Sequence, residues 1–393
     1  MSESADSHLS GRPLLFTGFI LTGFVTTVLG PVLPWLSARW HLTDAAAGAL
    51  FTLQFAGSIV AGALSGLIVA RLGATATLAT GYVLMSAGFA GLALGERVAG
   101  TLAIAVAGIG IGFVVPATNM IVARLTPNRA ASALGALNFC WGIGAATWPM
   151  VVARFNPVPG VRVALLLVST LLGAMAVRMA WARFPVHILR PAAGSAPATW
   201  SWARLIIFGV CITLYSGIES AFGGWIAEYT RRLTVDSSTV ISMRWETAAS
   251  VFWAGLAAGR GLVAIGLAPR FENAALFTGL MLVGTAIATL LVLGGADRAV
   301  AGLSPVFVVA VACGLGLAPA FPVTMAALSR EVPPNVAQPM IALGSLGAAI
   351  VPWLVGAISS RTGSLSSGLS ALLGLLAVVI VLHIMRVTNV ARA

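Results

Sequence analysis

An acid and a tyrosine lie one helical turn apart near the middle of the chain, inside an apolar run that is long enough to cross a membrane. Tyr215 and Glu219 are spaced i and i+4, so they share one face of a helix. An acidic side chain is costly to place in hydrocarbon and by default indicates a functional site. We therefore predict that both residues bind substrate and that Glu219 could couple transport to an ion. A structural acid bonded to a neighbouring helix is the alternative.

Other polar and aromatic side chains at membrane depth could complete a binding site. Amide groups offer both hydrogen-bond donors and an acceptor, which suits a hydroxyl-rich ligand, and tryptophan rings can stack on the apolar face of a sugar. We see no cluster of inward-facing arginine that would hold an anionic substrate. Interhelical hydrogen bonding and packing are the alternative roles. The predicted substrate-binding set is Gln54, Asn119, Asn138, Trp141, Tyr215, Glu219 and Trp253.

A second group of residues lies nearer the ends of the predicted spans, where gates form. Gly223-Gly224 should weaken the helix that carries Glu219, and Trp225 and Tyr229 follow as another i, i+4 pair. We predict gating roles for Arg71, Arg260, Trp225 and Tyr229, with an aromatic belt and positive-inside residues as the alternatives. Glu228 is expected on a solvated surface.

Composition limits the class of protein. The chain has 393 residues, of which 59% are hydrophobic and only 8% charged, so its long apolar runs predict membrane spans. Its net charge of +11 is scattered through short loops, which does not favour nucleic-acid binding. The three cysteines lie in apolar runs without metal or disulfide spacing. The four histidines are scattered at ends and loops, and no catalytic grouping is present, so we predict no enzyme, cofactor or metal.

The apolar runs predict an all-α membrane protein with twelve transmembrane helices in two pseudo-symmetric six-helix bundles. The first run is expected to be a retained span, and the arginine bias of the loops favours cytoplasmic termini. The predicted domains are a cytoplasmic N-terminal tail at 1–13, a bundle at 14–183, a cytoplasmic linker at 184–202, a second bundle at 203–387 and a cytoplasmic tail at 388–393.

The two halves repeat each other. Gly108, Gly110 and Pro116 return at one constant offset as Gly314, Gly316 and Pro322, and Gly144 with Pro149 returns as Gly347 with Pro352. Matched glycine and proline predict matched close approaches and kinks of the backbone. Parallel repeats of this kind are typical of one large class of transporters.

At these residues the chain resembles the major facilitator superfamily, and more narrowly its fucose–proton symporter branch with related sugar carriers. Gly217-Ile-Glu219 with Gly224-Trp225 resembles the Gly-x-Glu…Gly-Trp pattern of that branch, and Gly255–Arg260 and Gly314–Pro322 resemble its motifs in spans 8 and 10. The superfamily's loop between spans 2 and 3 usually carries an Asp where this chain has Ala70. The acids of the symporter branch in spans 1 and 4 are missing as well, so Glu219 is expected to stand alone.

The resemblance implies the major facilitator fold and a monomeric secondary transporter in a bacterial-type inner membrane. From the polar site residues we predict a small polar organic solute; from the resemblance, a monosaccharide, moved by alternating access. Coupling to protons through Glu219, coupling to sodium and uncoupled facilitated diffusion all stay open. Efflux of amphipathic compounds is the main alternative, and a membrane enzyme or a sensor is less favoured.

Overall fold

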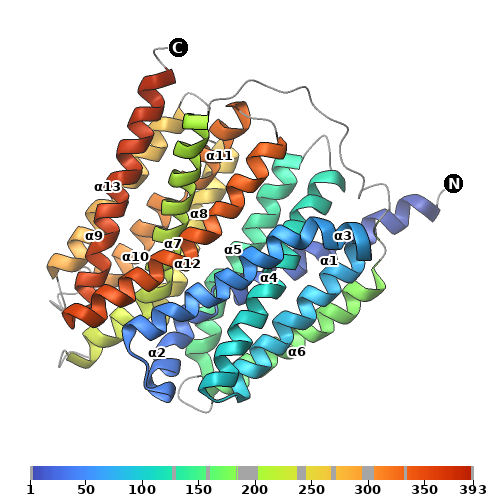
Figure 1. Cartoon of the computed structure of the whole chain (residues 1–393), viewed down its shortest axis with the longest axis horizontal. Helices are drawn as coiled ribbons and strands as arrows, with labels where there is room; N and C mark the ends of the chain where they lie inside the picture. Colours follow the sequence, from blue (N-terminus) through green and yellow to red (C-terminus); the bar gives the residue numbers. More distant parts are fainter. Residues whose placement is uncertain are drawn as a thin grey trace. The chain divides into compact units, whose positions relative to one another are not determined.

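The computed structural model describes residues 3–125, 130–155, 160–182, 184, 202–236, 245–266, 271–293, 305–331 and 334–390. Within these ranges the chain is helical and contains no strand, which confirms the predicted all-α class (Figure 1). The helices are α1 (Glu3–Thr26), α2 (Leu29–Trp40), α3 (Asp44–Leu94), α4 (Arg97–Leu125), α5 (Ala130–Phe155), α6 (Gly160–Trp181), α7 (Trp202–Asp236), α8 (Thr247–Gly266), α9 (Glu272–Leu293), α10 (Pro305–Leu317), α11 (Ala320–Glu331), α12 (Pro334–Thr362) and α13 (Leu365–Val390).

The thirteen helices of the described ranges correspond to the twelve predicted spans, because two pairs of helices each form one span and one helix holds two. Helices α1 and α2 form one apolar span that is interrupted at Thr27 and Val28, and α10 and α11 form another that is interrupted at Ala318 and Pro319. Helix α3 holds two spans joined at Gly73, whose φ of 82° and ψ of 162° only glycine adopts readily. Nine described helical segments are long and apolar enough to cross a membrane by length and composition alone.

The packing divides the chain into two compact units. The first unit comprises Met1–Val28 and Leu53–Gly194, and the second comprises Leu29–Thr52 and Ser195–Ala393. The short segment Leu29–Thr52, which holds α2 and the beginning of α3, therefore packs with the second unit. Most of the predicted 184–202 linker and the last residues of the 388–393 tail lie outside the described residues.

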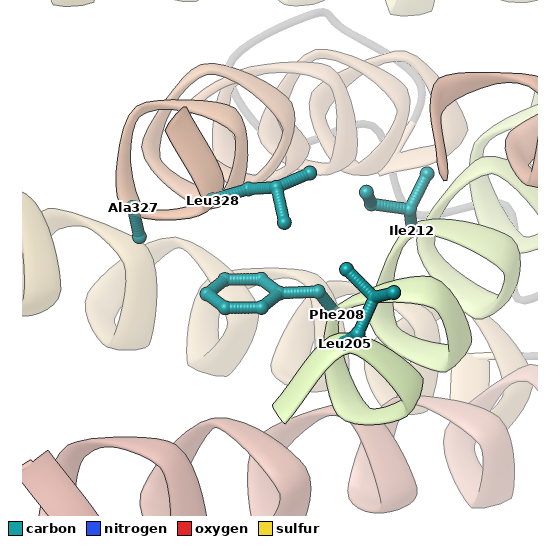
Figure 2. Packing of buried hydrophobic residues seen from close by; sticks show 5 residues of the cluster. All are labelled: Leu205, Phe208, Ile212, Ala327 and Leu328. Carbon is teal, nitrogen blue, oxygen red and sulfur yellow. The ribbon is translucent and has the colours of Figure 1, made fainter. Parts of the chain in front are cut away.

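Each unit has its own apolar core. In the first unit, α1 packs against α4 and α5, and the fully buried ring of Trp148 contacts Phe24 and Phe89 at centroid distances of 5.9 and 5.7 Å. In the second unit, α7 packs against α8, α12 and α13. A smaller cluster joins α7 to α11, as Figure 2 shows for Leu205, Phe208, Ile212, Ala327 and Leu328.

The predicted repeat of close backbone approaches is confirmed. In the first unit a Cβ added to Gly108 would meet the carbonyl of Gln54 on α3, and in the second a Cβ on Gly314 would meet that of Phe252 on α8. Gly144 approaches α1 at the Ile20 carbonyl, just as Gly347 approaches α7 at the Thr213 carbonyl. The kinks do not repeat in the same way. Helix α4 runs unbroken through Pro116, whereas the matching span is interrupted at Ala318 and Pro319, before Pro322.

Candidate functional site: a buried ion pair in the second unit

Glu219 and Tyr215 meet an arginine from the next helix. Tyr215 Oη donates a hydrogen bond to Glu219 Oε2 along one face of α7. Arg260 of α8 directs Nη2 at both partners, 2.7 Å from Glu219 Oε2 and 2.8 Å from Tyr215 Oη. The three side chains form a closed triangle of hydrogen bonds near the middle of α7, with one full negative and one full positive charge.

Two members of the triad are buried and the third is partly exposed. Tyr215 is 4% exposed and Glu219 is 9% exposed, whereas 21% of the Arg260 side chain is exposed. Phe321 of α11 covers one side, with its ring centroid 6.4 Å from that of Tyr215 and 5.9 Å from Arg260 Cζ. Attraction between opposite charges is stronger away from water, so the contact between the Glu219 carboxylate and the Arg260 guanidinium links α7 to α8.

Sequence reasoning did not foresee this ion pair. Its expectations were that Glu219 lacks a partner acid and that no cluster of arginines faces inward, and the single arginine of α8 contradicts neither. The gating role predicted for Arg260 stays a prediction, but its guanidinium belongs to the triad. One signal was available: Arg260 lies more than a helical turn before the end of α8, deeper than a loop arginine. Which face it occupies depends on the packing of α8 against α7, which the sequence does not specify.

The predicted weakening of the helix at Gly223-Gly224 is wrong. Helix α7 runs without interruption from Trp202 to Asp236. The two glycines instead make room for rings: a Cβ on Gly223 would meet Trp253 and Phe252, and one on Gly224 would meet Phe51. Helical hydrogen bonds and close packing on both sides outweigh the intrinsic helix penalty of glycine, which is about 1 kcal/mol per residue.

Three aromatic residues of the predicted site and gate, Trp225, Tyr229 and Trp253, are buried in the second unit. Trp253 lies edge-on to Phe252, with a distance of 4.8 Å between the ring centroids. It is on α8, about two helical turns before Arg260. Trp225 is fully buried, and its Nε1 donates to the Pro352 carbonyl at 2.9 Å. Tyr229 Oη lies 3.5 Å from the Leu290 carbonyl. The gating roles of Trp225 and Tyr229 and the binding role of Trp253 stay predictions.

In the first unit, predicted site residues gather around the interruption after α1. Gln54 Nε2 donates to the carbonyls of Val25 and Thr26 at 2.9 and 3.4 Å. Trp141 Nε1 donates to Thr26 Oγ1 at 2.8 Å. Trp148 Nε1 lies 3.3 Å from the Val28 carbonyl. A helix that ends within a membrane leaves carbonyls without helical partners, and Gln54 and Trp148 supply donors to them.

The two asparagines of the predicted site lie apart from that arrangement. Asn119 Nδ2 donates to the Val115 carbonyl of α4, and Asn138 Nδ2 donates to the Leu134 carbonyl of α5, each at 2.8 Å. Both bonds remain within the residue's own helix, so neither asparagine joins two helices through them. Their binding roles stay predictions, as does the gating role of Arg71, which is exposed beside the Gly73 turn.

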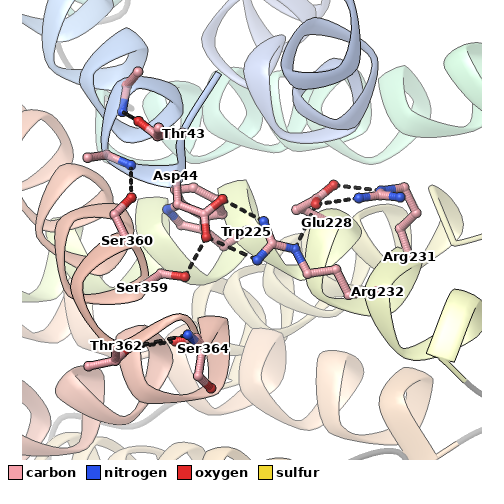
Figure 3. A network of polar contacts seen from close by, with 12 residues as sticks. Thr43, Asp44, Trp225, Glu228, Arg231, Arg232, Ser359, Ser360, Thr362 and Ser364 are labelled. Carbon is pink, nitrogen blue, oxygen red and sulfur yellow. Dashed lines mark hydrogen bonds and ion pairs between the residues drawn. The ribbon is translucent and has the colours of Figure 1, made fainter. Parts of the chain in front are cut away.

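A second charged network, which sequence reasoning missed, lies at the far end of α7 (Figure 3). Arg232 binds Asp44 of α3 through two bonds of 2.5 and 3.0 Å, and its Nε donates to Glu228 at 2.8 Å. Ser359 of α12 also donates to Asp44. Glu228 is only 2% exposed and also binds Arg231, so the expected solvated surface is wrong. The network joins α3, α7 and α12 within the second unit.

One histidine also departs from expectation. His383, predicted at an end or loop, is 2% exposed on α13. Its Nε2 lies 3.2 Å from Thr324 Oγ1, and its Nδ1 lies 2.9 Å from the Val379 carbonyl and 3.5 Å from Cys211 Sγ. The ring therefore links α13 to α7 and α11. Across the part of the chain that is described, no three His, Cys, Asp or Glu side chains are arranged to hold a metal ion.

Within the described residues, nine helical segments that are apolar enough to cross a membrane, the repeated backbone approaches of the two units and the Glu219–Arg260 ion pair are typical of helical membrane transporters. Residues 15–343 match the family model of the Major Facilitator Superfamily, and the chain belongs to this family. It is therefore a solute transporter and not an enzyme. A search of curated proteins found no match.

Solved structures share the fold at low sequence identity. The inward-open xylose transporter XylE from E. coli aligns with a TM-score of 0.74 at 14% identity, over 95% of each chain. The nucleoside transporter NupG gives 0.71 at 14%, covering 96% of this chain and 97% of its own. The human organic anion transporter MFSD10 gives 0.69 at 16%, covering 95% and 99%. At these identities the likeness shows the fold alone.

Proposed function

We propose that this chain is a secondary transporter for a small polar organic solute, most specifically a monosaccharide, which is bound at the Tyr215–Glu219–Arg260 triad. The solute would reach this site from the two sides of the membrane in turn, as in alternating access. The observation that carries the proposal is the ion pair between the buried Glu219 and the partly exposed Arg260, because ionisable residues within membrane-spanning helices are costly and mark transport pathways.

The chemistry of the triad suits hydroxylated ligands. Glu219 accepts hydrogen bonds, Arg260 donates them, and the rings of Tyr215 and Phe321 provide an apolar surface beside them. A few polar groups next to aromatic faces are typical of small-molecule sites. Transporters with this fold include carriers of xylose and of nucleosides, both of which are polyhydroxylated. These carriers support the solute class that we propose without assigning it.

We also propose that Glu219 is where a coupling proton binds. Proton uptake by its carboxylate would weaken the ionic bond to Arg260 and change the charge of the site. The rate of transport would then depend on a pH gradient across the membrane. Uncoupled facilitated diffusion is the alternative for the same site. The inner-membrane location and the cytoplasmic termini belong to this proposal as well.

Uptake by proteoliposomes tests the function. Labelled xylose, glucose and fucose are offered to vesicles that contain the native chain, with and without an imposed pH gradient. We expect saturable uptake that the gradient drives above equilibrium, and loss of this accumulation in Glu219→Gln. Glu96→Gln, which removes an exposed carboxylate between α3 and α4, is the matched control. Absence of uptake of any solute by the folded native chain would refute the proposal, and accumulation that survives Glu219→Gln would remove its coupling part.

A further inference from the structure

We infer that the phenol hydroxyl of Tyr215 links solute binding to the protonation of Glu219. Its single hydrogen is bound to Glu219 while that side chain is ionised, and it becomes available to the solute when Glu219 takes up a proton. The inference rests on the proposed function, since it names the group through which proton and solute act on each other at the same site. Each of the two ligands then raises the affinity for the other.

The hydroxyl of Tyr215 is fully used while Glu219 is ionised. Its oxygen carries one hydrogen, which it donates to Glu219 Oε2, and it accepts a bond of 2.8 Å from Arg260 Nη2. Tyr215 therefore has no second hydrogen to offer to a solute in this state. The residue is only 4% exposed and its ring packs near that of Phe321, so the hydrogen can change direction more easily than the ring can.

Protonation of Glu219 weakens the bond that holds this hydrogen. A hydrogen bond to a carboxylate is roughly twice as strong as one to a neutral carboxyl group. Once a proton binds to Glu219, the phenol hydrogen is free to turn about the Cζ–Oη bond towards an oxygen of the solute. Arg260 Nη2 can keep both of its contacts during this step, so the change does not require that the guanidinium leaves Glu219 or lacks other partners.

Arg260 is the charged neighbour of the pair from α8. Among the described residues, no other charged side chain contacts Glu219 or Tyr215. Helix α11 contributes the neutral ring of Phe321, whose centroid lies 6.4 Å from that of Tyr215. The hydrogen of Tyr215 is therefore shared between one carboxylate and whatever acceptor the solute brings.

The other helices that pack on α7 bring no charge into contact with the pair. Helix α12 meets α7 at Gly217, where a Cβ would touch Val351. Helix α10 has no charged residue, and the single charge of α2, Arg39, lies in its last turn. From α13, His383 lies 3.5 Å from Cys211, one helical turn before the pair on α7. Since His383 contacts neither member of the pair, the proton uptake that reaches the hydroxyl directly is that of the acid.

A hydroxylated solute supplies the acceptor for the released hydrogen. Its hydroxyl and ring oxygens accept hydrogen bonds, so the protonated site makes one bond to it that the ionised site cannot make. One such bond changes an affinity by a factor of about five. By linkage, a solute that binds the protonated site more tightly also draws a proton onto Glu219 when it binds.

Binding of labelled xylose and glucose to the purified chain in detergent, measured across pH, tests the inference. We expect the affinity of the native chain to rise about fivefold as the pH falls through the range in which Glu219 takes up its proton. Tyr215→Phe keeps the ring and removes only the hydroxyl, so its affinity should change by less than about twofold over the same range. Tyr82→Phe removes another buried hydroxyl, which lies 3.5 Å from Thr22 Oγ1 in the first unit, and should keep the pH dependence of the native chain.

Glu219→Gln distinguishes this role of Tyr215 from a structural one. The neutral amide holds the phenol hydrogen about as weakly as a protonated carboxyl group does. The sugars should therefore bind to Glu219→Gln at every pH about as tightly as they bind to the native chain at low pH. If Tyr215 only supported the fold, Tyr215→Phe would lower the affinity by the same factor at every pH and leave its pH dependence unchanged.

Proton uptake on binding is a second measurement, and it does not depend on the folding of any variant. Xylose is added to the native chain in weakly buffered detergent solution that contains a pH indicator. We expect the chain to take up protons as xylose binds, and Glu219→Gln to take up none.

The outcomes separate the inference from the proposed function. Xylose binding by the native chain without pH dependence and without proton uptake would overturn the inference, and so would native pH dependence in Tyr215→Phe. Either result leaves the proposed transport of a solute standing. If none of the sugars binds to the folded native chain or crosses the membrane of vesicles that contain it, the monosaccharide proposal fails and the inference fails with it.

Discussion

Two equivalent positions of the repeat have opposite chemistry. The close approaches at Gly144 and Gly347 match Ile20 of α1 with Thr213 of α7. Counting six residues forward from each reaches Thr26 in the first unit and Glu219 in the second. The close approaches at Gly108 and Gly314 match Gln54 of α3 with Phe252 of α8 in the same way. Counting eight residues forward from each reaches Gly62 in the first unit and Arg260 in the second. The ion pair of the second unit therefore corresponds to a threonine and a glycine in the first.

The backbone differs along with the charge. Helix α1 ends at Thr26, and side chains around it bond to the carbonyls that this end exposes. Helix α7 continues past Glu219, and the Glu219 carboxylate bonds to the side chains of Tyr215 and Arg260. The same repeated fold therefore accommodates polar groups in two ways. In the first unit, uncharged side chains bond to the carbonyls at the end of an interrupted helix. In the second unit, two charged side chains pair between two continuous helices.

The largest effect should come from leaving one charge of the triad unpaired. Arg260→Gln strands the Glu219 carboxylate, and we expect a loss of about 3 kcal/mol in stability, because removing one partner of a buried ion pair leaves an uncompensated charge. Thermal unfolding in detergent would measure it. The double variant Glu219→Gln/Arg260→Gln should recover most of the loss. A double variant as unstable as Arg260→Gln would mean that packing, and not charge, explains the effect.

Next in size should be the effect of filling the two matched close approaches. Gly144→Ala and Gly347→Ala each place a methyl group against a carbonyl of the facing helix, and each should cost about 1–3 kcal/mol because the helices must move apart. Gly135→Ala, where no neighbouring atom lies within 4 Å, is the control and should be neutral or slightly stabilising. Unequal losses at positions 144 and 347, measured by thermal unfolding, would show that the repeat does not extend to the tightness of this contact.

A smaller effect is expected at the second charged network. Arg232→Gln removes both bonds to Asp44 and one to Glu228, and should cost about 1–2 kcal/mol because Arg232 is one-third exposed. Arg231→Gln, which removes bonds to Glu228 in its own helix, should cost less than about 1 kcal/mol. Because Arg232 joins α7 to α3, we also expect faster hydrogen exchange at the start of α3 in Arg232→Gln alone. Equal exchange in the two variants would contradict this role.

The smallest effect should be that of removing one donor to the interrupted helix. Gln54→Leu removes the bonds to the Val25 and Thr26 carbonyls and should cost about 1 kcal/mol, since part of the loss is offset by burial of an apolar side chain. The transport rate for a given solute should fall less than it does in Glu219→Gln. If the two variants lower it equally, the first unit contributes as much as the triad does, and the contrast between the units would no longer describe function.

Much of the architecture could be predicted from the chain alone. Apolar runs and short loops predict membrane helices because a bilayer requires about 20 apolar residues per span. The glycines at 108, 144, 314 and 347 predict close approaches, because a backbone can approach a helix most closely where no Cβ intervenes. The bond between Tyr215 and Glu219 also follows from the sequence, because i and i+4 side chains meet on one helix.

The partners between helices were decided only by the tertiary structure. Nothing in the spacing of Arg260 shows that its guanidinium turns to α7, because rotation of a helix about its axis is set by packing with its neighbours. The same holds for Asp44 and Arg232, which are far apart in sequence, and for the burial of Glu228. The continuity of α7 through Gly223-Gly224 was likewise decided by the rings that pack on these glycines, because tertiary contacts override local propensity. The sequence alone placed an acidic residue, Glu219, within an apolar span. Only the packing of α8 against α7 placed the guanidinium of Arg260 beside it.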